Sequence, residues 1–105
     1  MIRAGSLDRT IVIERVTTSV TTEGTPSEVW APVATMRAQL VKRSADDTSH
    51  DTGAVTVTTV TFRTRFLDGV TPADRVTYAG RAFGIAEVVE LGRREGLDLR
   101  CVARG

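Results

Sequence analysis

The chain has 105 residues, of which 41% are hydrophobic and 26% charged, and its net charge at neutral pH is +1. These values are ordinary for a soluble globular protein, and the length predicts one domain, residues 1–105, with a modest core. They argue against a dedicated nucleic-acid-binding protein, which is usually strongly basic, and neither a signal peptide nor a membrane span is expected.

The first predicted strand lies in LDRTIVIERV, where hydrophobic residues alternate. Leu7, Ile11 and Ile13 share one face of an extended chain, and Val12 and Val16 share the other. We therefore expect a strand that is partly covered on both sides.

A polar turn region, TTSVTTEGTPSE, follows and contains Gly24. The next predicted strand, VWAPVATMRAQLVK, contains Pro32. Because proline cannot donate to a strand ladder, we expect an edge, a bulge or a boundary between two strands there. Beyond it Met36, Ala38 and Leu40 alternate with polar residues.

The segment RSADDTSHDTG, residues 43–53, has no large apolar residue and holds the single histidine, His50. The row Ser49-His50-Asp51 looks like a hydrolase triad, but triad members converge from separate elements, whereas neighbours in an extended chain point apart. A metal site at Asp47, His50 and Asp51 would lack a second histidine or a cysteine pair. We predict a solvated polar loop.

A long strand is predicted in AVTVTTVTFRTRF, residues 54–66. Its hydrophobic residues change from odd positions, such as Val57, to even ones, such as Val60. A slip of one residue moves every side chain to the other face of a strand. We expect either a bulge near Thr58–Thr59 or a strand that passes from one sheet to another.

The C-terminal third predicts two hairpins. Ala79-Gly80 forms the first turn, because glycine accepts positive φ, and GRREG closes the second. In the last strand, the residues expected to point inward are Leu97, Leu99, Cys101 and Ala103. The predicted fold is all-β: a small antiparallel β-barrel or sandwich of six or seven strands with one long polar loop, residues 43–53.

Few residues suggest chemistry. Cys101 is expected to be an inert core residue, since free cysteines are often buried, and with one cysteine there is no internal disulfide. Two arginine pairs, Arg63 with Arg65 and Arg93 with Arg94, could contact phosphates, but such pairs are common on solvated surfaces. Trp30 is either a core anchor or an interface residue. We predict no enzyme activity, no cofactor and no metal.

Three stretches, AGSLDRTIVIER, TTEG…VWAPVATMRAQL and GVTPADRVTYAGRAFGIAEV, together resemble the phage head-tail joining protein family. These are the head-closure or stopper proteins of long-tailed phages and gene transfer agents. The residues that carry the resemblance are Gly5, Leu7, Gly24, Trp30, Pro72, Arg75, Gly80, Phe83, Ile85 and Arg100.

The resemblance implies a β-barrel that forms a homo-oligomeric ring in the neck of a virion, assembled in the bacterial cytoplasm. A hexamer is favoured and a dodecamer is the alternative. The ring would have portal or adaptor proteins above it and a tail terminator or tail tube below, and DNA would pass through without sequence-specific binding.

The resemblance also implies that the polar loop lines or gates the DNA channel. The residues predicted to do so are Arg43, Asp46, Asp47, Ser49, His50 and Asp51. Arg3, Arg9 and Arg15 are candidate partners of Glu87 and Glu90 between neighbouring copies. The alternatives are an adaptor or tail terminator of the same fold, or a small nucleic-acid-binding β-barrel.

Overall fold

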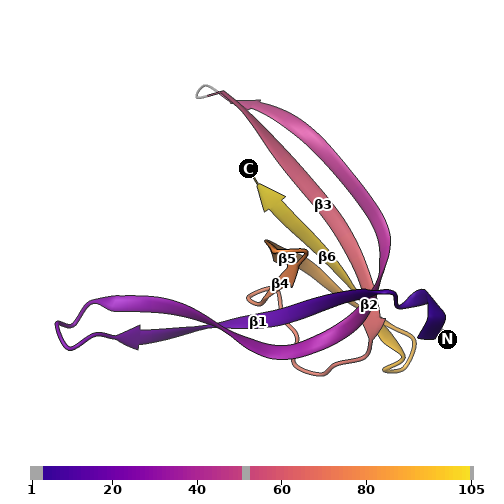
Figure 1. The fold of residues 1–105 in the computed structure, drawn as a ribbon, viewed down its shortest axis with the longest axis horizontal. Coiled ribbons are helices and arrows are strands. Elements are labelled where there is room, and N and C mark those ends of the chain that lie inside the picture. Colours follow the sequence, from indigo (N-terminus) through magenta and orange to yellow (C-terminus); the bar gives the residue numbers. More distant parts are fainter. Residues whose placement is uncertain (1–3, 51–52, 105) are drawn as a thin grey trace.

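The computed structural model describes residues 4–50 and 53–104, which form one short 3-10 helix and six strands (Figure 1). The elements in chain order are η1 (Ala4–Ser6), β1 (Arg9–Val20), β2 (Pro26–His50), β3 (Gly53–Arg65), β4 (Arg75–Tyr78), β5 (Arg81–Leu91) and β6 (Gly96–Arg104). No helix among these residues is long and apolar enough to cross a membrane.

The strands form one antiparallel sheet that closes on itself in the order β1-β2-β3-β6-β5-β4. Closure comes from a short ladder between β1 and β4, in which Val12 pairs with Thr77 and Glu14 with Arg75. The predicted all-β antiparallel barrel is therefore confirmed. Closure removes the exposed strand edges that an open sheet would leave along the barrel.

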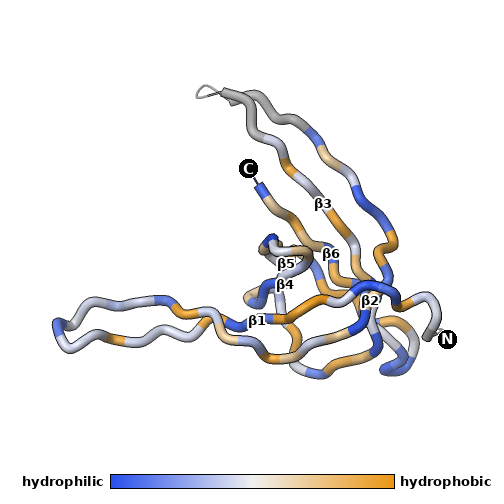
Figure 2. The backbone as a smooth tube through the Cα atoms, viewed as in Figure 1, coloured by the Kyte–Doolittle hydropathy of each residue, from blue (hydrophilic) through white to orange (hydrophobic). Residues whose placement is uncertain are grey.

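The barrel interior is filled by every second residue of each strand, as strand geometry requires. Figure 2 shows hydrophobic residues gathered where the six strands come together. The buried cluster consists of Ile11, Ile13, Ala38, Val60, Phe62, Val76, Phe83, Ile85, Leu97, Leu99, Cys101 and Ala103. The inward faces predicted for β1 and β6 are thus confirmed, with Leu7 also buried.

The turn between β4 and β5 has the predicted two residues, Ala79 and Gly80, with φ of 52° and 78°. Two successive positive φ values define the turn type whose twist matches a two-residue hairpin. Pro32 lies at a bulge, as expected, because Ile13 pairs with Ala34 and Glu14 with Pro32, which leaves Val33 without a partner on β1.

The bulge predicted near Thr58–Thr59 is wrong. β3 pairs continuously with β6 there, and Thr58 and Val60 are both buried. The irregularity lies instead on β2, between Leu40 and Lys42. The change of parity arises because Val57 is the last residue of β3 that pairs with β6, so the alternation that the core imposes ends there.

The long polar loop predicted at residues 43–53 is also wrong in form. β2 continues to His50 and β3 begins at Gly53, and the pairing is unbroken from Arg43 opposite Val60 to His50 opposite Gly53. Only residues 51–52, between the two strands, lie outside the described residues. Backbone groups can satisfy one another across a ladder whatever the side chains are, and threonine-rich β3 favours an extended chain.

Two hairpins project from the barrel in different directions (Figure 1). We call residues 16–30 the first arm, formed by the end of β1 and the start of β2. We call residues 42–58 the second arm, formed by the end of β2 and the start of β3. The arms leave opposite ends of the barrel. β1 starts at Arg9, which lies beside Tyr78, and runs away from Tyr78 to the first arm. The second arm rises from the end of the barrel that contains Tyr78.

Candidate functional site

The first arm is a two-stranded ribbon whose residues 17–29 are all exposed. At its tip the Thr21 N–H donates to the Thr25 carbonyl at 3.0 Å, and the Thr25 N–H donates to the Thr21 hydroxyl at 3.2 Å. The Thr17 hydroxyl donates to the Val29 carbonyl at 3.2 Å. Val20 is 68% exposed and Val29 is 50% exposed. Such a ribbon has no core of its own, so its exposed valines are available to another molecule.

The base of the first arm is fixed to the barrel by Arg15 and Asp74. The Arg15 guanidinium donates from Nε to Oδ1 of Asp74 at 3.0 Å and from Nη2 to Oδ2 at 3.1 Å, and Nη2 also donates to the Gly69 carbonyl at 2.8 Å. Asp74 is only 2% exposed. The hydrogen bonds from Arg15, with a further one from the Thr71 backbone N–H, lower the pKa of Asp74.

A second polar cluster lies on the outer surface beside this base. Glu14 Oε1 accepts hydrogen bonds from the Thr77 hydroxyl at 2.8 Å and from Arg75 Nε at 2.7 Å, and these bonds lower the pKa of Glu14. The Arg75 guanidinium also lies 4.3 Å from the centre of the Trp30 ring. Trp30 is therefore partly exposed under a cation, and it is not part of the barrel core.

The second arm carries the residues that the sequence predicted to line a channel. Arg43 and Asp46 are exposed and lie opposite Val60 and Val57. Three further predicted residues occupy consecutive or nearby backbone positions on β2, namely Asp47 opposite Thr56, Ser49 opposite Ala54 and His50 opposite Gly53. Asp51 lies outside the described residues.

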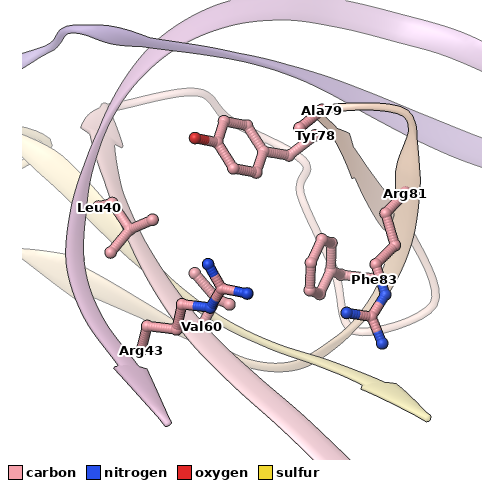
Figure 3. Close-up of a pocket in the computed structure, with 7 residues that line it drawn as sticks. All are labelled: Leu40, Arg43, Val60, Tyr78, Ala79, Arg81 and Phe83. Atoms are coloured by element: carbon pink, nitrogen blue, oxygen red, sulfur yellow. The ribbon is translucent and has the colours of Figure 1, made fainter. Parts of the chain in front are cut away.

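A pocket of about 130 Å³ opens at the end of the barrel from which the second arm rises. Its walls come from two sides, β2 with β3 and the β4–β5 hairpin (Figure 3). We call it the mouth pocket, and it is lined by Leu40, Arg43, Val60, Tyr78, Ala79, Arg81 and Phe83. Its aromatic wall is rigid, because the Phe62 ring packs edge-on against two of its members. The ring centres are 5.2 Å apart for Phe62 and Tyr78 and 6.2 Å apart for Phe62 and Phe83.

The residues that carried the family resemblance occupy structural positions. Leu7, Phe83 and Ile85 are buried, and Gly24 and Gly80 take positive φ in turns. The remaining members are more exposed: Gly5 in η1, Trp30 and Arg75 in the outer cluster, Pro72 in the turn before β4, and Arg100, whose Nε lies 3.8 Å from Glu87 Oε1.

Three of the ion-pair partners suggested between copies have partners within this chain. Arg15 binds Asp74, Arg9 lies beside Asp8 and donates to the Tyr78 hydroxyl, and Glu87 faces Arg100 across an exposed 3.8 Å pair. The sequence reasoning missed Asp74 and Glu14, because their partners are 59 and 61 residues away along the chain. No local sequence pattern predicts such contacts, because they form only when the barrel closes.

Evidence for catalytic chemistry is sparse in the part of the chain that the structure describes. No group of three or more His, Cys, Asp and Glu side chains among these residues is placed to hold a metal ion. Cys101 is fully buried, and burial raises the pKa of its thiol to about 12. A thiol in this environment is a poor nucleophile at neutral pH.

Comparison with solved structures shows where this fold occurs. A chain from the virion of a native gene transfer agent particle matches with a TM-score of 0.76 at 18% identity, over 100% of this chain and 98% of that chain. The solution structure of protein SF1141 from Shigella flexneri 2a matches with a TM-score of 0.66 at 19% identity, over 95% of each chain. At these identities the likeness establishes a shared fold.

No curated protein sequence matches the chain. The family model for phage head completion proteins, in contrast, matches residues 2–104, which is nearly the whole chain and includes both arms and the mouth pocket. The chain therefore belongs to the phage head completion protein family.

Proposed function

We propose that this protein is a structural component of the virion neck, a head-closure connector between the portal or adaptor above and the tail below. Family membership supports a role in head completion, and the solved chain of similar fold from a gene transfer agent virion supports a place in such a particle. The observation that carries the proposal is the pair of long arms on a small closed barrel. A barrel supplies a rigid body, and arms supply contacts beyond it.

In this proposal identical copies abut around an axis and form a ring, with six copies favoured and twelve as the alternative. Rings use head-to-tail contacts, which require two different complementary surfaces on each copy. The barrel offers such surfaces, because its two arms leave from opposite ends. The protein is expected to be monomeric or weakly associated in isolation and to assemble on a neighbouring ring.

In this proposal the second arm lines the DNA channel. It extends beyond the last pair of β3 with β6, Val57 opposite Arg104, as a ribbon of two strands. The carboxylates of Asp46, Asp47 and Asp51 would repel DNA phosphates, which suits a conduit through which DNA must slide. Copies of this polar ribbon that meet near the axis could also hydrogen-bond to one another and retain packaged DNA.

The test shortens the second arm without touching the barrel. Residues 47–56 are replaced by Asn-Gly, which joins Asp46 to its register partner Val57 through a two-residue hairpin turn. We expect particles with this variant to lose packaged DNA and to join few tails, measured as nuclease-protected DNA and as the tailed fraction in electron micrographs. Particles that retain DNA and join tails normally would contradict the channel role.

A length-matched control separates charge from length. The triple variant Asp46→Asn, Asp47→Asn, Asp51→Asn keeps the arm, so the gate should still close, while DNA release should become slower and more dependent on salt.

A cryo-EM map of the particle neck then distinguishes a stopper from an adaptor or tail terminator by the height of the ring. The nucleic-acid-binding alternative predicts DNA affinity of the isolated protein that falls steeply with salt.

A further inference from the structure

We propose that the tip of the first arm of one copy inserts into the mouth pocket of the next copy, so that this contact joins the copies head to tail. The proposal rests on ring formation as proposed above and names the two surfaces that form the joint. The argument uses the shape of the pocket, the charges of both surfaces and their positions on the barrel.

The mouth pocket fits an aliphatic side chain. Its floor and walls include Leu40, Val60 and Phe83, and its volume of about 130 Å³ is close to the roughly 150 Å³ of cavities that hold a benzene ring. Tyr78 is fixed by its edge-on contact with Phe62 and by a hydrogen bond from Arg9 to its hydroxyl at 3.1 Å. A preformed apolar pocket of this kind costs little to organise on binding.

The rim of the pocket is positive. Arg43 stands on the β2 side and Arg81 on the β4–β5 side (Figure 3). Among residues 5–46 and 56–104, whose side chains the structure describes, neither has a carboxylate partner, whereas Arg15, Arg63 and Arg75 are all paired with acids. Arg81 instead lies over the Phe83 ring at 5.4 Å. The rim therefore offers two guanidinium groups to an acidic partner.

The first arm has the complementary character. Glu23 and Glu28 are the only charged residues between positions 16 and 30, and both are exposed. Val20 is the most exposed large hydrophobic residue among those described, at 68%, and it pairs with Pro26 next to the turn. An apolar tip flanked by carboxylates matches an apolar pocket flanked by guanidinium groups.

The positions of the two surfaces suit a contact between copies. The pairing of Val12 with Thr77 places the start of β1 beside the β4–β5 turn. The hydrogen bond from Arg9 to Tyr78 joins the same two segments. The first arm leaves the other end of β1, so the arm tip and the pocket lie at opposite ends of the barrel. About five residues of ribbon, Val16–Val20, carry the tip roughly 17 Å outward at the usual rise per residue. Such an arm reaches a neighbour.

Disulfide trapping tests the contact in assembled particles. The chain that carries both V20C and R81C should form a ladder of linked multimers on a non-reducing gel, because each copy would be joined to the next. Chains with V20C alone or R81C alone should give no ladder. Buried Cys101 stays out of the reaction because of its high thiol pKa. A double variant that runs only as a monomer would overturn the proposal.

The matched control is V89C with R81C. Val89 is exposed, at 42%, but lies on β5 and outside the first arm. This pair should give no ladder. If it links as well as the V20C and R81C pair does, the trapping reports only crowding of copies, and the specific contact is wrong.

A charge exchange gives a second, independent readout. The arm variant E23R/E28R and the mouth variant R43E/R81E should each reduce incorporation into particles at least tenfold, and the chain with all four changes should recover most of it. Thermal unfolding of the purified variants checks that each folds. Failure of the four-change chain to recover would contradict the contact.

The two proposals fail in different ways. If the shortened second arm releases DNA but the cysteine ladder is absent, head closure stands and the arm-to-pocket contact is wrong. If the ladder forms but shortening the second arm has no effect, the copies are joined as inferred and the channel role is wrong. If isotope-labelled protein shows the mouth residues shifting with short duplex DNA, and the V20C and R81C chain gives no ladder in assembled particles, the pocket binds phosphate and the contact is overturned.

Discussion

The bidentate pair between Arg15 and Asp74 joins the base of the first arm to the connection that precedes β4, with both N–O distances near 3 Å. Asp74 is almost completely buried, and it also accepts the Thr71 backbone N–H. The same arginine holds the Gly69 carbonyl. The direction of the first arm is therefore set by a network that crosses 59 residues of sequence, and not by the ribbon alone.

Asp74→Asn should destabilise the protein at neutral pH by about 1–3 kcal/mol, because it removes a charged acceptor from buried hydrogen bonds. Asp68→Asn, an exposed change in the same connection, is the control and should have little effect. Urea unfolding monitored by circular dichroism measures both. Equal stability of the two variants would show that the pair contributes nothing to the fold.

The pH dependence of the same pair has a definite sign. The pKa of Asp74 is lowered in the folded state, first by the hydrogen bond from Arg15. The contribution of the Asp74 carboxylate to the free energy of unfolding is therefore complete above the pKa of an unfolded aspartate, about 3.9. It is lost as the pH falls through the lower folded-state pKa. The stability difference between wild type and Asp74→Asn should shrink below about pH 4. A constant difference down to pH 2 would contradict this reading.

Cys101 should resist thiol reagents in the folded protein. Its thiol pKa is raised by burial from 9.0 to about 12, which lowers the thiolate fraction at pH 8 by about 1000-fold. Labelling by a chromogenic disulfide should therefore follow unfolding in a urea series. The raised pKa also means that its contribution to stability is complete below pH 9.0 and is lost as the pH rises toward about 12. Rapid labelling of the native protein at pH 8 would contradict the burial.

The barrel could be predicted from the sequence because burial imposes a period of two. Ile11 and Ile13 on β1 lie on either side of Val12, Leu99 and Cys101 on β6 lie on either side of Arg100, and all four are buried. The turn at Ala79-Gly80 followed from residue chemistry alone. These features depend on local pattern, so a single sequence contains them.

The second arm could not be predicted in the same way. Beyond Val57 the ribbon has no barrel beneath it, and its β2 half, residues 43–50, has no hydrophobic alternation that would mark it as strand. The polar residues 43–50 therefore had the composition of a loop although they are extended. The mouth pocket could not be predicted either, since Arg43 and Arg81 line the same pocket only when the sheet closes.

Ala79 should be a site where substitution stabilises the protein. Its φ of 52° is unfavourable for a residue with a Cβ that lacks a polar group to support it. Ala79→Asn creates the Asn-Gly pair that this turn type prefers and should add about 0.5–1 kcal/mol to the free energy of unfolding. Ala82→Asn, an exposed change within β5, is the control and should be neutral or destabilising. A loss of stability on Ala79→Asn would contradict the turn geometry.

The contact of Arg75 with Trp30 should be visible in fluorescence, because the chain has one tryptophan. Arg75→Gln removes the cation above the ring, so acrylamide should quench Trp30 more strongly, and stability should fall by about 0.5–1 kcal/mol. Arg100→Gln is the control, since its 3.8 Å pair with Glu87 is exposed on both sides and exposed pairs contribute little. If both variants quench like wild type, Arg75 does not cover the ring in solution. The base of the first arm would then be fixed here only by the hydrogen bond from Thr77 to Glu14 and by the ladder between β1 and β4.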